Sequence, residues 1–108
     1  MASIVLLGPD AVLLMALSNV LRVRGFSVSL ACDEDQARRA LSDPPSLVIW
    51  DRQTREAVPD PTILGFDGPA IVLASPPQLT FGSTPNRRVL RKPFGVEQLI
   101  QAAIELTA

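Results

Sequence analysis

Two charged residues close apolar segments of this chain. Asp51 ends the run SLVIWD, and Lys92 precedes a proline in LRKPFG. A carboxylate and an ammonium group that meet inside a protein form an ion pair, and removing one partner of such a pair typically costs about 3–5 kcal/mol. The retention of Asp51 and Lys92 therefore requires no catalytic role, although strand ends are also where many proteins bind or react with ligands.

Other reactive groups are few. The segment Gly8-Pro9-Asp10 precedes a helical pattern, and the N–H groups of a helix start can hold an anion, but Asp10 would repel one. The chain has no histidine, which excludes histidine acid–base chemistry and leaves Ser75 without a base to activate it. The single cysteine, Cys32, cannot form an internal disulfide. We expect it to be a small buried side chain in a reducing, cytoplasmic setting.

The composition favours one small folded domain over residues 1–108. Hydrophobic residues make up 47% of the chain, and 10 basic residues nearly balance 11 acidic ones. A nucleic-acid surface would need a basic patch, so we expect no nucleic-acid partner. The apolar N-terminal run breaks at Gly8-Pro9, short of the roughly 20 residues of a membrane span, so we expect no membrane partner.

Apolar runs of strand length alternate with helical patterns along the chain. Five strands are expected, over residues 3–8, 26–31, 46–51, 70–75 and 87–93. Three helices are expected, over residues 10–24, 33–42 and 96–106. Asp10 and Asp33 are placed to cap the first two, the second in a capping-box pattern with Gln36. The last helix should bury one face, which is made of Val96, Leu99, Ile100, Ala103 and Ile104.

Unbroken apolar strands that alternate with helices indicate a parallel sheet buried on both faces. The carboxyl ends of its strands should form the functional edge. The residues expected at this edge are Gly8, Pro9, Asp10, Asp51, Ala74, Ser75, Lys92 and Pro93. Two connections, over residues 52–69 and 76–86, are rich in proline and glycine, so little helix is expected in either.

The order of these elements resembles the receiver domain of bacterial response regulators over the whole chain. The resemblance rests on PPSLVIWD, GPAIVLAS and VLRKPF, and on the spacing from Ile4 to Gly25-Phe26. It implies a flavodoxin-like, doubly wound five-stranded parallel sheet in the order 2-1-3-4-5, with the family's third and fourth helices shortened or lost. It also implies that Asp51 stands at the phosphoacceptor position, that Lys92 would contact the phosphoryl group, and that the bond between Lys92 and Pro93 is often cis.

The chain departs from this family where the phosphoryl chemistry is assembled. The family has two adjacent acidic residues after its first strand that hold magnesium, and an ungapped alignment places Gly8 and Pro9 there, with Asp10 one position late. Magnesium usually needs carboxylate ligands, and phosphoryl transfer relies on it to neutralise charge. The family's hydroxyl residue near the end of the fourth strand is replaced by Ala74, with Ser75 one residue later.

Three functions remain open from the sequence. The departures favour a receiver-like signalling module that is not an enzyme. This module would need neither a cofactor nor phosphorylation. It would bind a histidine kinase, another regulator or a second copy of itself. The second function is an atypical response regulator in a two-component phosphorelay, phosphorylated on Asp51. Its Mg²⁺ would be held by Asp10, water and backbone carbonyls, with Asp51 as a further candidate ligand. The third is a flavodoxin-like domain for a small anion or nucleotide, although no glycine-rich nucleotide motif is present.

The first helical segment carries more apolar residues than a sheet-facing side requires. Val12, Met15 and Val23, with Asn19 between them, form a stripe that the resembled family normally makes charged. Single exposed apolar residues are normal on protein surfaces, whereas a contiguous apolar patch tends to mark an interface. Both interpretations are open at this point, and the stripe is the candidate interface of this chain.

Overall fold

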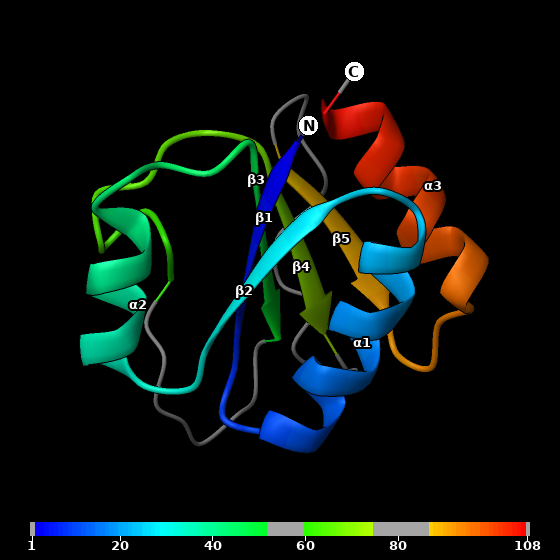
Figure 1. Ribbon diagram of the computed structural model, residues 1–108, viewed down its shortest axis with the longest axis horizontal. Helices are drawn as coiled ribbons and strands as arrows, with labels where there is room; N and C mark the ends of the chain where they lie inside the picture. Colours follow the sequence, from blue (N-terminus) through cyan, green and yellow to red (C-terminus); the bar gives the residue numbers. More distant parts are fainter. Residues whose placement is uncertain (1, 52–59, 75–86, 108) are drawn as a thin grey trace.

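The computed structural model describes residues 2–51, 60–74 and 87–107, which form a parallel sheet with helices on both faces (Figure 1). The strands are β1 (Ser3–Leu7), β2 (Ser27–Ala31), β3 (Leu47–Asp51), β4 (Ala70–Ala74) and β5 (Arg87–Arg91). The helices are α1 (Ala11–Val23), α2 (Glu34–Leu41) and α3 (Val96–Thr107). All neighbouring strands are parallel, in the order β2-β1-β3-β4-β5. The predicted fold and strand order are therefore confirmed.

The sheet separates two apolar layers. β3 and β4 are buried along their whole length, and β1 is buried after its first residue, because these strands carry apolar side chains on both faces. One face packs against α1 and α3, and the other against α2 and the segment that contains Phe66. The edge strand β2 alternates between exposed and more buried positions from Ser27 to Leu30, as predicted, but the alternation ends at Ala31, which is buried.

Both predicted N-caps are present. Asp10 Oδ1 accepts hydrogen bonds of 3.1 Å from the backbone N–H groups two and three residues later. Asp33 Oδ1 accepts one of 2.8 Å from the N–H of Gln36. The return bond of the capping box differs from the expected pattern, because Gln36 Oε1 accepts from the N–H of Cys32 instead of that of Asp33. Cys32 is itself partly exposed rather than buried, because it follows an edge strand.

The buried face of α3 differs in part from the predicted one. Three of the five predicted residues are buried, but Val96 and Ile104 are 45% and 44% exposed, and Ala102 is buried instead. The small side chains of Ala102 and Ala103 let this part of the helix pack closely on the sheet. The buried face of α3 is therefore rotated about the helix axis, toward Ala102 and away from Ile104, relative to the predicted face.

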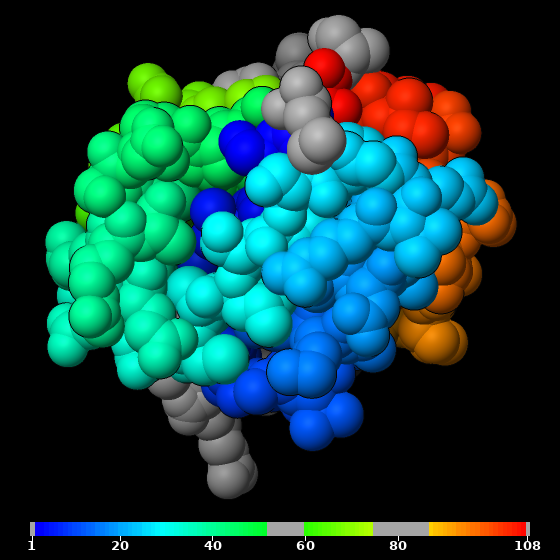
Figure 2. Space-filling view, viewed as in Figure 1, coloured from blue at the N-terminus to red at the C-terminus, as the bar shows by residue number. Residues whose placement is uncertain are grey.

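The outer surface of α1 is exposed, as predicted. Val12, Met15 and Val23 are 81%, 57% and 84% exposed. Figure 2 shows α1, in blue, uncovered on the side that faces the viewer. Within the described ranges, no helix is long and apolar enough to cross a membrane.

The described part of the connection before β4 contains a turn and no helix. Residues 61–65 form this turn, in which Gly65 has a φ of 92°, a left-handed value that suits glycine. Phe66 then packs on the sheet. Residues 52–59 and 76–86, where little helix is predicted, lie outside the described residues.

A bidentate ion pair joins this turn to β5. Arg87 Nη1 and Nη2 donate hydrogen bonds of 3.0 and 2.8 Å to the two carboxylate oxygens of Asp60. The backbone N–H and hydroxyl of Thr62 also donate to Asp60 Oδ1. Sequence analysis missed this pair, for which the Asp-Pro-Thr turn pattern at residues 60–62 was the only local signal. The pair anchors the start of the strand whose far end leads into Lys92.

Removing the charge of Asp60 is expected to destabilise the fold. Burial raises the pKa of Asp60, but the hydrogen bonds from Arg87 and Thr62 outweigh it and lower the pKa from 3.8 to about 2. Because the folded-state pKa lies below the unfolded one, this stabilisation is present above about pH 4 and is lost as the pH falls through about 2. We expect Asp60→Asn to lower the free energy of unfolding at pH 7 by about 1–2 kcal/mol.

Urea unfolding of the wild type and of Asp60→Asn at several pH values measures this effect. The difference between the two proteins should be constant from pH 7 down to about pH 4 and shrink toward pH 2. A difference that does not change with pH would show that the Asp60 carboxylate charge does not stabilise the fold.

Candidate functional site

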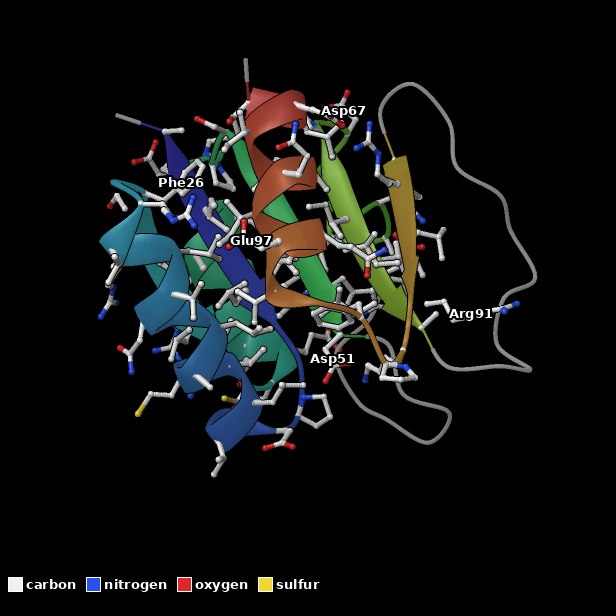
Figure 3. All side chains as sticks on the ribbon, turned by 90° about the vertical axis from the view of Figure 1, so that its right-hand side faces the viewer. Phe26, Asp51, Asp67, Arg91 and Glu97 are labelled. Atoms are coloured by element: carbon white, nitrogen blue, oxygen red, sulfur yellow. The ribbon has the colours of Figure 1, made fainter. Side chains whose placement is uncertain are left out.

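Gly8, Asp51, Ala74 and Lys92, four of the residues predicted for the carboxyl edge of the sheet, lie together there. The parallel register of β1 and β3 places Gly8 next to Asp51. The backbone N–H of Lys92 donates a 2.9 Å hydrogen bond to the carbonyl of Ala74, which brings the end of β5 beside the end of β4. Figure 3 shows Asp51 and Arg91 at this same edge. The edge therefore brings together residues from four different segments of the chain.

Asp51 and Lys92 form an ion pair. Lys92 Nζ contacts Asp51 Oδ1, and the Asp51 side chain is 0% exposed whereas that of Lys92 is 24% exposed. A buried carboxylate is costly unless a charge partner or hydrogen bonds stabilise it. The lysine ammonium group supplies such a charge. The peptide bond between Lys92 and Pro93 is cis, as the resemblance implies.

Gly8 is buried and packs directly against Asp51. A Cβ atom built on Gly8 would lie 2.9 Å from the Cβ of Asp51 and 3.5 Å from its Oδ2. Real Cβ atoms essentially never approach a neighbour within 3.0 Å, so no side chain fits at residue 8 unless β1 or β3 moves. The position that aligns with the first acidic residue of the resembled family therefore has no room for a side chain unless one of the two strands shifts.

The side chains next to Asp51 do not suit Mg²⁺. Gly8 and Pro9 carry no side-chain oxygen, and Oδ1 of the exposed Asp10 is committed to the cap of α1. Lys92 competes with any cation for Oδ1 of Asp51. Mg²⁺ prefers octahedral oxygen ligands, usually with one or two carboxylates. Among residues 2–51, 60–74 and 87–107, no group of three or more acidic, cysteine or histidine residues could hold a metal ion.

The end of β4 offers no hydroxyl group at Ala74. This residue is fully buried in the layer that faces α2. Ser75, the alternative source of a hydroxyl, lies outside the described residues. Its placement at the functional edge stays a prediction.

A groove lies beside the ion pair, between α1 and the segment that joins β5 to α3. Its volume is about 560 Å³, and its lining is made of Leu13, Leu17, Lys92, Pro93, Phe94 and Val96. Sequence analysis placed Pro93 at this edge but missed Phe94, and it assigned Val96 to the buried face of α3. The groove is largely apolar and continues the exposed surface of α1.

Solved receiver domains superpose on nearly the whole chain. A response regulator receiver protein from Sinorhizobium medicae WSM419 is 23% identical, with a TM-score of 0.78 over 98% of this chain and 94% of that protein. A response regulator receiver domain protein from Clostridium thermocellum is 18% identical, with a TM-score of 0.77 over 99% and 94% of the two chains. This chain has the receiver-domain fold.

A third receiver domain, from the hybrid histidine kinase CckA, is 18% identical, with a TM-score of 0.73 over 98% of this chain and 99% of that one. No protein-family model matches the chain, and no curated protein matches it in sequence. Within the receiver-domain fold, Asp51 ends the third strand and Lys92 follows the fifth. Gly8 and Pro9 follow the first strand, in contact with Asp51 through Gly8.

Proposed function

We propose that this chain is a signalling module with the receiver-domain fold that binds protein partners and does not depend on phosphorylation of Asp51. The observation that carries this proposal is the contact between Gly8 and Asp51. Because a Cβ at residue 8 would lie 2.9 Å from the Cβ of Asp51, an acidic residue at this position would require β1 or β3 to shift. Phosphoryl transfer without Mg²⁺ would lack its main source of charge neutralisation.

The charges around Asp51 support the same proposal. Phosphorylation would replace the single charge of the carboxylate by about 1.5 to 2 negative charges on a phosphoryl group, at a side chain that is 0% exposed. Lys92 contacts Asp51 and neutralises the charge of its carboxylate. Asp51 and Lys92 are therefore better suited to stabilising the sheet edge than to accepting a phosphoryl group.

The proposed module has no catalytic activity, cofactor or nucleic-acid partner, and it works in the cytoplasm. Its partner is a histidine kinase, another response regulator or a second copy of the chain. The retained pair of Asp51 and Lys92 favours one alternative, an atypical regulator phosphorylated on Asp51. Binding of an anion or nucleotide at the start of α1 has less support, because the Asp10 carboxylate already accepts hydrogen bonds from the N–H groups of Val12 and Leu13.

The fluorescence of Trp50 tests the proposal. Trp50 is the single tryptophan, is 7% exposed and precedes Asp51. We expect no change in its emission when Mg²⁺ and then beryllium fluoride, a mimic of the phosphoryl group, are titrated into the folded protein. A saturable, Mg²⁺-dependent change that disappears in a folded Asp51→Asn variant would instead favour the phosphorylated regulator.

A further inference from the structure

The outer face of α1 is an apolar stripe with no charged residue in its middle. Val12, Ala16, Asn19 and Val23 follow a spacing of three to four residues and are all exposed, so they lie along one line of the helix. The buried residues of α1 lie on the opposite side, toward the sheet. Met15, 57% exposed, flanks the stripe. A helix face this apolar is unusual beside water unless another surface covers it.

The charges of α1 stand at its two ends and have opposite signs. Asp10 caps its start, and its first turn holds no acidic residue. Arg22 lies in its last turn and Arg24 at its end, so both basic groups reinforce the negative end of the helix dipole. Arg24 pairs with Glu97 of α3, and Arg22 donates one hydrogen bond to the Val28 carbonyl and remains exposed.

We infer that two copies of this chain associate through α1, with the two helices antiparallel. This inference rests on the proposed function, because it names the partner that the module binds. The two-fold axis that relates the two α1 helices passes level with the midpoint between residues 17 and 18. Val12 of one copy then lies against Val23 of the other, and Ala16 of one copy lies against Asn19 of the other. The small Ala16 near the axis lets the helices approach closely, and the two contacts repeat by symmetry.

A second copy fits this face better than an unrelated charged protein. In the antiparallel arrangement, the acidic start of each α1 lies near the basic end of the other, and the two helix dipoles oppose each other favourably. The uncharged middle of the stripe offers a charged partner nothing to pair with. The groove lined by Leu13, Phe94 and Val96 widens the apolar surface toward the roughly 800 Å² that each partner of a standard interface buries.

Disulfide cross-linking tests the helix direction. In a Cys32→Ser background, a Val12→Cys chain is mixed with a Val23→Cys chain and oxidised. Residues 12 and 23 are about 16 Å apart along one helix, so the antiparallel arrangement brings 12 next to 23 and separates 12 from 12. We expect the mixed product to form at least about tenfold more than the Val12→Cys self-product. Equal yields, or a dominant self-product, would overturn the antiparallel arrangement.

Sedimentation equilibrium tests the association itself. At about 100 µM, we expect the wild type to show twice its 11.6 kDa mass. Val23→Glu should raise the dissociation constant at least about tenfold. The matched control is Ile63→Glu, because Ile63 is 72% exposed in the 61–65 turn on the opposite side of the sheet, and it should leave the dimer unchanged.

A monomeric wild type, or a dimer insensitive to Val23→Glu, would overturn the inference. A monomeric wild type would leave the proposed function intact if beryllium fluoride also leaves the fluorescence of Trp50 unchanged. The partner that binds the stripe would then be a different protein. A Mg²⁺-dependent change in Trp50 fluorescence on addition of beryllium fluoride to an intact dimer would overturn the proposed function and leave the inferred dimer standing.

Discussion

Replacing Lys92 by methionine should destabilise the protein by about 3 kcal/mol. Methionine keeps much of the aliphatic volume of lysine and removes the ammonium group. The carboxylate of Asp51, with its side chain 0% exposed, then loses the charge that neutralises it. This expected loss of unfolding free energy lies at the low end of the range for broken buried ion pairs, because the Lys92 side chain is 24% exposed. Urea unfolding followed by Trp50 fluorescence measures the change.

A double-mutant cycle separates the ion pair from other effects of the substitution. Asp51→Asn removes the charge that Lys92→Met leaves behind, so the double variant should recover part of the stability lost in Lys92→Met. Arg91→Met is the matched control, because Arg91 is the exposed last residue of β5 and immediately precedes Lys92, and it should change stability by about 0.5 kcal/mol or less. If Lys92→Met costs no more than Arg91→Met, the pair does not stabilise the sheet edge.

Introducing aspartate at Gly8 should destabilise the protein by about 2–4 kcal/mol and should not create a magnesium site. The new Cβ would lie 2.9 Å from that of Asp51, so β1 or β3 must shift. A second carboxylate beside Asp51 would also repel the first in a buried setting. Urea unfolding with and without Mg²⁺ measures both the loss and any stabilisation by the metal.

Two further variants isolate the causes. Gly8→Ala introduces the Cβ without the charge. It should lower the free energy of unfolding by about half or more of the amount expected for Gly8→Asp. Gly95→Asp is the matched control, because a Cβ there meets no atom closer than Gln98 Oε1 at 3.8 Å and aspartate is a good residue at a helix start. Gly95→Asp should leave the free energy of unfolding unchanged or raise it. A Mg²⁺-dependent gain in stability for Gly8→Asp would contradict the expectation that this variant forms no magnesium site.

The sheet and the caps could be predicted because their causes are local. β1, β3 and β4 are unbroken apolar runs, and such runs fit a sheet with both faces covered. Asp10 and Asp33 precede helical patterns, and each accepts hydrogen bonds from the helix that it begins. The meeting of Asp51 and Lys92 follows from the strand order, since both stand at carboxyl ends of parallel strands.

Other features depend on distances that a sequence pattern does not contain. The contact between Gly8 and Asp51 requires two strands to approach closely at one residue pair. Asp60 and Arg87 are 27 residues apart and meet because the 61–65 turn folds back to β5. The prediction for Ile104 was wrong because the exact rotation of α3 is set by close packing of Ala102, which helical periodicity alone does not give.

The most direct measurement of the role of Asp51 is the intact mass of the folded protein after incubation with acetyl phosphate and Mg²⁺. A receiver domain that keeps two adjacent acidic residues after its first strand serves as the positive control. We expect this chain to gain no mass while the control gains one phosphoryl group. A gain of one phosphoryl group that is absent from a folded Asp51→Asn variant would contradict a structural role for Asp51 and establish it as a phosphoacceptor.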